Sequence, residues 1–314
     1  MSAVSAAGPA GGVELVVGED AVTATAGGVE LLRYVLAPQD PQMEAPRPYV
    51  WPLRTLGGRD VATWRPHDHV WHKGLSFVVA DVSGENFWGG PTYDRELGYV
   101  QRENDGAQVH VRRRDAPPGA FCHELAWVAQ DGRHLLDEVR TLAVALGPVD
   151  DGWRLDWRTA LTNRSDAPLV LGSPTTLGRP DAGYGGLFWR GPRAFAGGAV
   201  HVEGASGGDE LMGARSPWAA YVGRHDGADG SASVVMARGA ATTAGGRRWF
   251  ARTEPFATLA TAPFFDEEVV LAPGERLDLD QHVVVVGSDA GADGCARVAA
   301  AVRAAPILPP ADAP

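Results

Sequence analysis

The stretch His123–Leu146, HELAWVAQDGRHLLDEVRTLAVAL, indicates the fold class of the whole chain. Apolar and polar residues alternate on both sides of its central Asp-Gly dipeptide, which supplies the positive φ angles of a two-residue type I′ hairpin turn. A period of two places His123 and Trp127 on one face of the first strand. It places Glu138 and Arg140 together on one face of the second. An antiparallel hairpin follows, and its register stays open, so that Glu138 and Arg140 face either the His123 side or the opposite side.

The same kind of strand pattern recurs along most of the chain. Short runs rich in β-branched residues are bounded by Gly, Pro, Asn or Asp, and almost no helical pattern lies between them. They cover 13–17, 21–27, 29–37, 75–82, 107–115, 122–130, 134–146, 153–164, 169–174, 232–239, 257–265 and 277–287. Many short strands without crossover helices predict an all-β protein made of antiparallel sheets stacked as a sandwich.

The end of the chain reads differently. The Ala-rich segment 291–305 has Cys295, Val298 and Val302 near helical spacing, which predicts one short C-terminal helix. We expect the 314 residues to form a single β-sandwich domain, with residues 1–10 and 304–314 as flexible tails. The Gly- and Pro-rich segments Gly172–Gly198 and Gly204–Pro217 predict long functional loops within that domain.

Composition excludes several classes of function. The net charge is −11, Lys73 is the single lysine, and no basic stripe with interleaved aromatics is present, so nucleic acid is not expected as a partner. No apolar run is long enough to span a bilayer, and no membrane association is expected. The N-terminus shows no signal or transit peptide, which predicts a cytoplasmic location. Cys122 and Cys295 lack CxxC spacing and are expected to be inert thiols.

Three of the nine histidines lie within six residues in RPHDHVWHKG, 65–74. On an extended strand His67 and His69 would share a face, and His72 would join them only if the chain turned. Imidazole takes up and releases protons near neutral pH, so catalysis or substrate binding is the first interpretation. A divalent metal held by His67, His69 and His72 is the second, and incidental surface histidines are the third. Asp68 is placed to orient a neighbouring histidine.

Aromatic residues are concentrated in the same part of the chain. A sugar ring stacks its C–H face on an aromatic ring while its hydroxyl groups require directed hydrogen bonds. The mixture of rings, histidines and carboxylates between residues 51 and 99 therefore predicts a carbohydrate site, and core packing is the alternative for each single ring. The rings are Trp51, Trp64, Trp71, Phe87, Trp88, Tyr93 and Tyr99.

The Gly-rich segment Thr175–Phe195, TTLGRPDAGYGGLFWRGPRAF, is a candidate binding loop. Its glycines permit close backbone approach, Tyr184 can stack on a ligand, and Arg190 can donate charge-assisted hydrogen bonds. The glycine spacing does not match a phosphate-binding fingerprint, and an ordinary turn is the equal alternative. The chain also lacks the G-x-S-x-G elbow, the Walker loop, H-E-x-x-H and the dinucleotide fingerprint, so the corresponding chemistries have no support.

An ordered set of motifs resembles a bacterial family of unknown function that carries the label PmoA or "methane oxygenase". The motifs are RPYVWPLRTLGGRDVAT, DHVWHKGL, GENFWG, His123 with Trp127 and Glu138-x-Arg140, GYGGLFWR, and FFDEEVVLAPGERLDL, and they run from about Pro46 to Gly287. Where the family pattern reads D-H-P-x-H-R-G-L, this chain has Val70 and Lys73 in place of Pro and Arg, which leaves His69 and His72 as the matched pair. Lys73 keeps the charge but loses the planar fork of arginine.

The resemblance implies a fold similar to the galactose mutarotase-like super-sandwich, in which histidines and a carboxylate serve sugar acid/base chemistry. Copper-dependent methane oxidation by a membrane subunit, which the label implies, conflicts with the absence of a membrane-spanning segment in this sequence and is excluded. The expected ligand is a small carbohydrate, and homodimerisation through a sheet edge would be unsurprising.

We therefore expect a carbohydrate-active protein that carries out epimerase, lyase or hydrolase chemistry on a sugar or an oxidised sugar derivative. In this interpretation His69 and His72 hold or protonate an oxygen, Glu138 acts as general base, and Arg140 neutralises developing negative charge. The alternatives are a noncatalytic sugar-binding or regulatory module and a metal-dependent enzyme that uses the histidine cluster. The residues expected to bind substrate are His67, Lys73, Trp88, His123, Tyr184 and Arg190.

Overall fold

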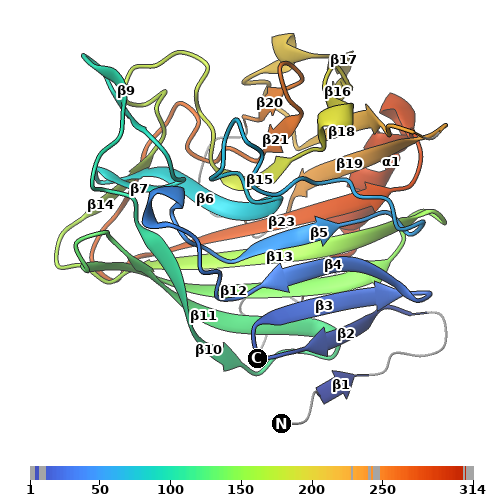
Figure 1. Cartoon of the computed structure of the whole chain (residues 1–314), viewed down its shortest axis with the longest axis horizontal. Helices are drawn as coiled ribbons and strands as arrows, with labels where there is room; N and C mark the ends of the chain where they lie inside the picture. Colours follow the sequence, from blue (N-terminus) through green and yellow to red (C-terminus); the bar gives the residue numbers. More distant parts are fainter. Residues whose placement is uncertain are drawn as a thin grey trace.

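The computed structural model describes residues 4–6, 12–227, 229–239, 242, 248–306 and 308. Two large sheets face each other, and all pairings between named strands within these residues are antiparallel, which confirms the predicted sandwich (Figure 1). A two-stranded hairpin, three short 3₁₀ helices and one C-terminal helix complete the described fold.

The first sheet has twelve strands, and its central path runs β1-β2-β3-β4-β5-β6-β15-β21-β20. Its strands are β1 (Val4–Ala6), β2 (Glu14–Val17), β3 (Ala21–Ala26), β4 (Val29–Val35), β5 (Tyr49–Leu53), β6 (Leu75–Val82), β7 (Glu85–Phe87), β14 (Leu169–Gly172), β15 (Gly186–Arg190), β20 (Phe250–Arg252), β21 (Thr258–Ala260) and β22 (Val269–Leu271). Strands from both ends of the sequence therefore meet at β6 and β15.

The second sheet has nine strands in the order β10-β11-β12-β13-β23-β19-β18-β16-β17. They are β10 (Ala107–Arg114), β11 (Ala120–Val128), β12 (His134–Leu146), β13 (Gly152–Asn163), β16 (Ala199–Val202), β17 (Ala205–Gly207), β18 (Trp218–Arg224), β19 (Ser231–Arg238) and β23 (Arg276–Val286). The remaining elements are β8 (Thr92–Asp94), β9 (Gly98–Val100), η1 (Gln42–Glu44), η2 (Arg193–Phe195), η3 (Asp209–Leu211) and α1 (Gly291–Ala304).

The β11–β12 hairpin settles the register that the sequence leaves open. His123 pairs with Arg140 and Leu125 pairs with Glu138, so these four side chains share one face, which points into the core between the sheets. The predicted two-residue type I′ turn is wrong. Within the turn only Gly132 has a positive φ. The Ala129 N–H donates to the Arg133 carbonyl and the Gly132 N–H donates to the Ala129 carbonyl, which closes a three-residue loop, another common hairpin geometry.

Three apolar clusters divide the molecule into layers. The largest lies between the two sheets, the second joins the outer face of the second sheet to α1, and the third lies on the outer face of the first sheet. Strand β6 contributes to two of them, because Phe77 and Val79 enter the central core whereas Val78 and Ala80 enter the outer cluster. Both faces of β6 are covered, which explains its continuous apolar run.

The predicted C-terminal helix is confirmed, and Cys295, Val298 and Val302 are its buried face against the second sheet (Figure 1). Most of the predicted tails, residues 1–10 and 304–314, lie outside the described residues. Within those ranges residues 4–6 form β1, Ala304 ends α1, and Leu308 is buried with its backbone N–H 3.4 Å from Asp156. Among the described residues no helix has the length and apolarity to cross a membrane.

Candidate functional site

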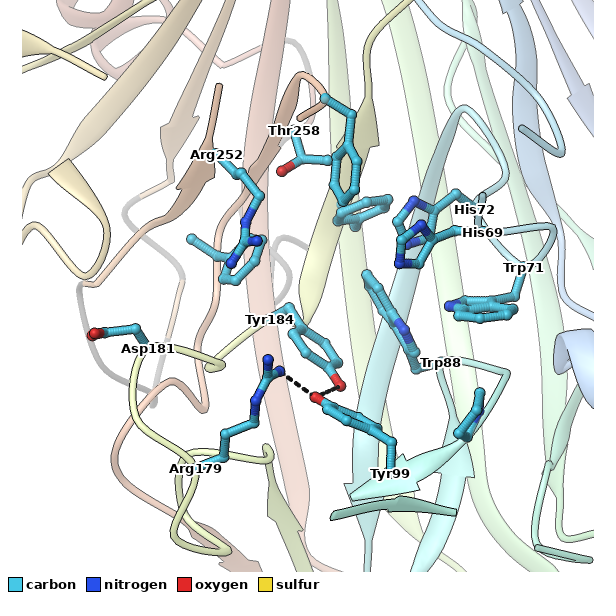
Figure 2. Close-up of a pocket in the computed structure, with 14 residues that line it drawn as sticks. His69, Trp71, His72, Trp88, Tyr99, Arg179, Asp181, Tyr184, Arg252 and Thr258 are labelled. Carbon is cyan, nitrogen blue, oxygen red and sulfur yellow. Dashed lines mark hydrogen bonds between the residues drawn. The ribbon is translucent and has the colours of Figure 1, made fainter. Parts of the chain in front are cut away.

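A pocket opens on the outer face of the first sheet, above the third apolar cluster. Its cavity measures about 290 Å³, close to the lower end of the usual range for small-molecule sites. Segments far apart in the sequence build it: the loop before β6, the β8–β9 hairpin, the loop before β15, and strands β20 and β21 (Figure 2). The lining residues are His69, Trp71, His72, Trp88, Pro91, Tyr99, Arg179, Asp181, Tyr184, Phe188, Phe250, Arg252, Phe256 and Thr258.

Two consecutive turns bring His69 and His72 together. The backbone N–H of His69 donates to the carbonyl of Pro66 over 3.1 Å, and that of His72 donates to the carbonyl of His69 over 2.9 Å. The segment is therefore not an extended strand, and the two imidazoles stack with their centroids 4.6 Å apart (Figure 2). From the sequence, His72 is expected to join the other histidines only if the chain turns. The chain does turn before His72, and His69 and His72 share the pocket.

The base of this loop is fixed by buried charges. Lys73 is fully buried and pairs with Glu44 and, over 3.1 Å, with Asp40. Burial lowers the pKa of Lys73, although both carboxylates oppose that shift. Arg65 also pairs with Glu44, so both ends of the loop are tied to one carboxylate. Lys73 does not line the pocket, and its predicted contact with substrate is replaced here by a structural ion pair.

Gly74 allows the loop to return to the sheet. Its φ is +61°, and a Cβ at this position would lie 2.3 Å from the carbonyl oxygen of Val50 on the neighbouring β5. The backbone of Gly74 also exchanges hydrogen bonds with Thr63 and Arg190. Only glycine fits such a close approach of two backbones at a positive φ.

A chain of hydrogen bonds runs through both histidines. Arg190 donates from Nη1 to Nδ1 of His72 over 2.8 Å and from Nη2 to Oδ2 of Asp68 over 2.7 Å. The same Asp68 oxygen lies 2.8 Å from Nδ1 of His69. Arg190 is buried behind the pocket wall, and its guanidinium also lies 3.9 Å from the ring centroid of Phe256. Arg190, predicted to bind substrate, does not line the pocket and instead contacts Asp68 and the lining residue His72.

Within this series of hydrogen bonds, Asp68 is held charged and His72 is held neutral. Burial alone would raise the pKa of Asp68, but hydrogen bonds from Arg190 and His69 and the charge of Arg190 lower it to about 2. Burial, and after it the positive charge of Arg190, lowers the pKa of His72 well below its usual range. At neutral pH Asp68 is therefore an ionised carboxylate and His72 is an uncharged imidazole.

Three lining side chains keep a polar atom without a hydrogen-bond partner among the described residues. These atoms are Nε1 of Trp71, Nε2 of His72 and Oγ1 of Thr258, and each exposes almost no surface. Leaving such a group unpaired costs roughly 1–3 kcal/mol. Buried unpaired groups in a pocket wall mark positions where a ligand oxygen would restore a hydrogen bond.

Aromatic rings form most of the remaining wall. Trp88 and Tyr184, both predicted to contact substrate, line the pocket with their ring centroids 4.5 Å apart. Trp71 packs over Gly90, where a Cβ would meet its indole at 2.7 Å. The Tyr184 hydroxyl lies 2.9 Å from the Tyr99 hydroxyl, and Figure 2 shows this link at the lower side of the pocket.

Glu138, Arg140 and His123 lie elsewhere. All three are fully buried in the core between the sheets. Arg140 donates to both oxygens of Glu138 over 2.7 Å, to Tyr34 over 2.9 Å and to Gln108 over 2.8 Å. This geometry does not support Glu138 as a general base or Arg140 as the group that neutralises developing negative charge, because both side chains already bond to each other and to core residues.

His123 belongs to the same interior network. Its Nε2 lies 3.0 Å from the Tyr34 hydroxyl and its Nδ1 lies 3.0 Å from Nδ1 of His110. Burial, together with the charge of Arg140, lowers the pKa of His123 to about 2. The structure thus separates His123 from the pocket, in contrast to its predicted contact with substrate.

His67 is exposed, contacts Arg193, and does not line the pocket. The side chains of His67, His69 and His72 therefore do not meet at one position, as the predicted metal site would require. The Nδ1 atoms of His69 and His72 already face Asp68 and Arg190. Within the described residues there is no group of three or more His, Cys, Asp or Glu side chains with metal-ligand geometry.

Several lining residues carry no local sequence signal. Arg252, Phe256 and Thr258 reach the pocket because β20 pairs with β21, and β21 pairs with β15. Arg179 and Asp181 lie in the predicted binding loop Thr175–Phe195, which therefore contributes to the pocket lining. The other long segment, Gly204–Pro217, contributes no residue to this lining.

Several solved structures show a weak similarity to the chain. The GH36 alpha-galactosidase AgaB from Geobacillus stearothermophilus is 12% identical with a TM-score of 0.41, over 95% of this chain and 42% of that chain. The alpha-galactosidase from Lactobacillus brevis is 9% identical with a TM-score of 0.40, over 87% and 39%. A polysaccharide lyase is 14% identical with a TM-score of 0.35, over 90% and 33%. The chain thus spans less than half the length of these proteins, and likeness at this level identifies neither substrate nor reaction.

No curated protein matches the chain. The sequence motifs resemble a family of unknown function over most of the length. A family model with the description "Family of unknown function (DUF6807)" matches residues 21–300, which include every residue that lines the pocket. Because that range covers most of the 314 residues, the chain belongs to the DUF6807 family.

Proposed function

We propose that the pocket binds a sugar or an oxidised sugar derivative and catalyses the transfer of a proton on it. Aromatic rings line the cavity, and between them lie histidines, arginines and unpaired hydrogen-bonding groups. This is the combination that a sugar requires, because its C–H faces stack on rings while its hydroxyl groups need directed partners. The size of the cavity suits one sugar unit.

The catalytic part of the proposal rests on the hydrogen bonds of the two stacked histidines, which place the ring proton on different nitrogens. A guanidinium only donates hydrogen bonds, so Nδ1 of His72 must accept from Arg190, and neutral His72 carries its proton on Nε2. An ionised carboxylate only accepts, so Nδ1 of His69 donates to Asp68, which leaves Nε2 as the nitrogen of His69 that can take up a proton. His69 is then a base and His72 a hydrogen-bond donor within the same pocket.

This arrangement suits abstraction of a proton from a carbon next to a carbonyl group. His69 Nε2 takes the proton, and the electron pair of the broken C–H bond moves into an enolate. The enolate oxygen accepts a hydrogen bond from His72 Nε2, which has no other partner. A proton delivered by water to the opposite face gives an epimer, and His69 then releases its proton to solvent. Alternatively, a leaving group departs from the neighbouring carbon with its bonding electrons and takes the proton from His69, which gives an unsaturated product. A neutral imidazole with a lowered pKa is a known means of polarising a carbonyl.

Exchange of substrate protons with solvent tests this proposal. The untagged protein would be incubated in D₂O with aldoses, 3-keto-sugars and sugar acids, and proton NMR would follow loss of the C–H signal next to the carbonyl and the formation of new products. We expect exchange with at least one member of the panel. His69→Gln should lower its rate by about 10²–10⁴-fold, and His72→Gln by about 10²–10³-fold. His134→Gln, an exposed histidine on β12, is the matched control.

The same experiment separates the alternatives. Sugar binding that persists in His69→Gln, with no exchange in the wild-type protein, would identify a noncatalytic sugar-binding module, which the aromatic lining alone would also suit. Exchange that stops with a chelator and returns with a divalent cation would favour the metal-dependent enzyme. If no sugar binds at all, the carbohydrate assignment itself is lost.

A further inference from the structure

We propose that the natural ligand is an anionic sugar, whose terminal carboxylate or phosphate is held by Arg179 and Arg252. The inference rests on the proposed function, because it names the class of sugar that the same pocket takes. Both arginines line the cavity, Arg179 from the loop before β15 and Arg252 from the end of β20 (Figure 2).

The charges of these two arginines are not neutralised by the protein. Within the part of the chain that the structure describes, neither Arg179 nor Arg252 forms an ion pair with a carboxylate. Arg190, Arg248 and Arg140, by contrast, are each paired with an Asp or Glu. The chain as a whole carries a net charge of −11, so two guanidinium groups in one cavity give its lining a charge of the opposite sign to that of the molecule.

Among the described residues that line the pocket, Asp181 is the single carboxylate, and it is exposed. In Figure 2 its side chain lies at the outer side of the pocket, beyond Arg179 and Arg252. His72 adds no positive charge to the lining, because burial holds it neutral. Two guanidinium groups against one carboxylate leave the lining positive, which favours an anion from the ligand.

The arginines are held in place by aromatic neighbours. Arg179 donates to the Tyr99 hydroxyl, and its guanidinium carbon lies 4.7 Å from the Tyr99 ring centroid. Tyr99 is fixed in turn by its hydrogen bond to Tyr184, whose pKa is raised well above its usual range by burial and by Tyr99. The guanidinium of Arg252 lies 5.9 Å from the ring of Phe250. These contacts orient each group and use only part of its donors, so that N–H groups remain for a ligand.

The position of the arginines also sets the orientation of the ligand. Figure 2 shows His69 and His72 on one side of the pocket and Arg252 on the other, with Tyr184 between them. A sugar that carries a carbonyl at one end and an anionic group at the other matches this separation. Open-chain uronic acids and sugar phosphates both have this form. In either case the anion anchors the far end while the carbonyl end meets the histidines.

Calorimetric titration with matched ligands tests the inference. The panel is glucose and galactose as neutral sugars, glucuronate and galacturonate as carboxylates, glucose 6-phosphate as a phosphate, and glucosamine as a cation. We expect at least one anionic ligand to bind ten times more tightly than its neutral counterpart, and glucosamine to bind most weakly. Arg179→Gln and Arg252→Gln should each lower the affinity for the anion about tenfold and leave the affinity for neutral sugars unchanged. Arg224→Gln, an exposed residue on β18, is the control.

Each outcome has a distinct meaning. Preference for the uronates over the phosphate assigns a carboxylate ligand, and the reverse order assigns a phosphate. Equal binding of neutral and anionic sugars overturns the inference and leaves the proposed carbohydrate function standing. Absence of binding by any sugar removes both. Loss of neutral and anionic binding together in the arginine variants would show that the side chains shape the pocket instead of recognising charge.

Discussion

Arg190 and His72 form a buried hydrogen bond in which the guanidinium Nη1 lies 2.8 Å from the imidazole Nδ1, so the arginine fixes the tautomer of the histidine. Arg190 reaches this position from the end of β15 and spans to Asp68 with its second nitrogen. The planar fork is essential, because one side chain holds two partners at fixed angles. The acid/base assignment therefore depends on a residue outside the pocket lining.

Arg190→Lys should disturb this assignment without removing the positive charge. An ammonium group lacks the planar fork, so we expect it to keep one of the two partners and release the other. Nitrogen-15 chemical shifts of the His72 ring should change from a single Nε2–H tautomer to a mixture. The rate of substrate proton exchange should fall at least tenfold, with little change in sugar affinity. An unchanged ring spectrum would show that Arg190 does not set the tautomer.

The lowered pKa of His72 predicts how the free energy of unfolding changes with pH. The unfolded chain binds a proton at His72 below about pH 6.5, whereas the folded protein does not, so acidification favours unfolding. The free energy of unfolding attributable to His72 should therefore decrease by at most about 1.4 kcal/mol for each pH unit below 6.5. Urea unfolding of the wild-type protein and of His72→Gln between pH 5 and 8 measures the difference. Parallel curves across that range would contradict the assignment.

The sequence predicts the strands because their signal is local. Alternation and bounding Gly, Pro, Asn and Asp indicate β11, β12, β13 and β23, and helical spacing indicates α1. The same local reasoning finds His69 and His72, since a short histidine motif needs only one turn to form a pair. Features that lie within a few residues of each other are the ones that a single sequence reveals.

Residues brought together by strand order escape that reasoning. Thr258 and Arg252 reach the pocket because β21 pairs with β15 and β20 pairs with β21, and nothing near them in the sequence marks a site. Glu138 and Arg140 show the converse. Their alternation is predicted correctly, but which layer covers that face is a property of the whole sandwich, and here it is the core. An interior ion pair and a catalytic pair have the same local pattern.

Glu138 and Arg140 should accordingly affect folding and not turnover. Breaking a buried ion pair from one side leaves an unpaired charge, so Glu138→Gln should lower the free energy of unfolding by about 3–5 kcal/mol. The loss of the acceptor of Trp127 adds to this effect. Asp60→Asn, which removes an exposed partner of Arg54, should cost about 1 kcal/mol or less. Urea unfolding compares the two variants, and a folded Glu138→Gln protein with no proton exchange would revive the catalytic role of Glu138.

The two parts of the Tyr184 side chain have different expected roles. The ring stacks on the sugar, and the hydroxyl group supports anion recognition. Tyr184→Phe keeps the ring against Trp88 but removes the hydroxyl that lies 2.9 Å from Tyr99, the residue that orients Arg179. Neutral sugars should bind this variant as they bind the wild-type protein. Anionic sugars should bind about three- to tenfold more weakly, which corresponds to a hydrogen bond worth roughly 0.5–1.5 kcal/mol.

Trp88→Ala tests ring stacking in the same titrations. Removal of the indole takes away a stacking surface that every sugar ring uses, so the affinity should fall about tenfold or more for neutral and anionic ligands alike. The two variants together distinguish a pocket that recognises a ring from one that also recognises a charge. Equal losses for both ligand classes in Tyr184→Phe would mean that its hydroxyl supports the shape of the wall and has no selective effect on Arg179.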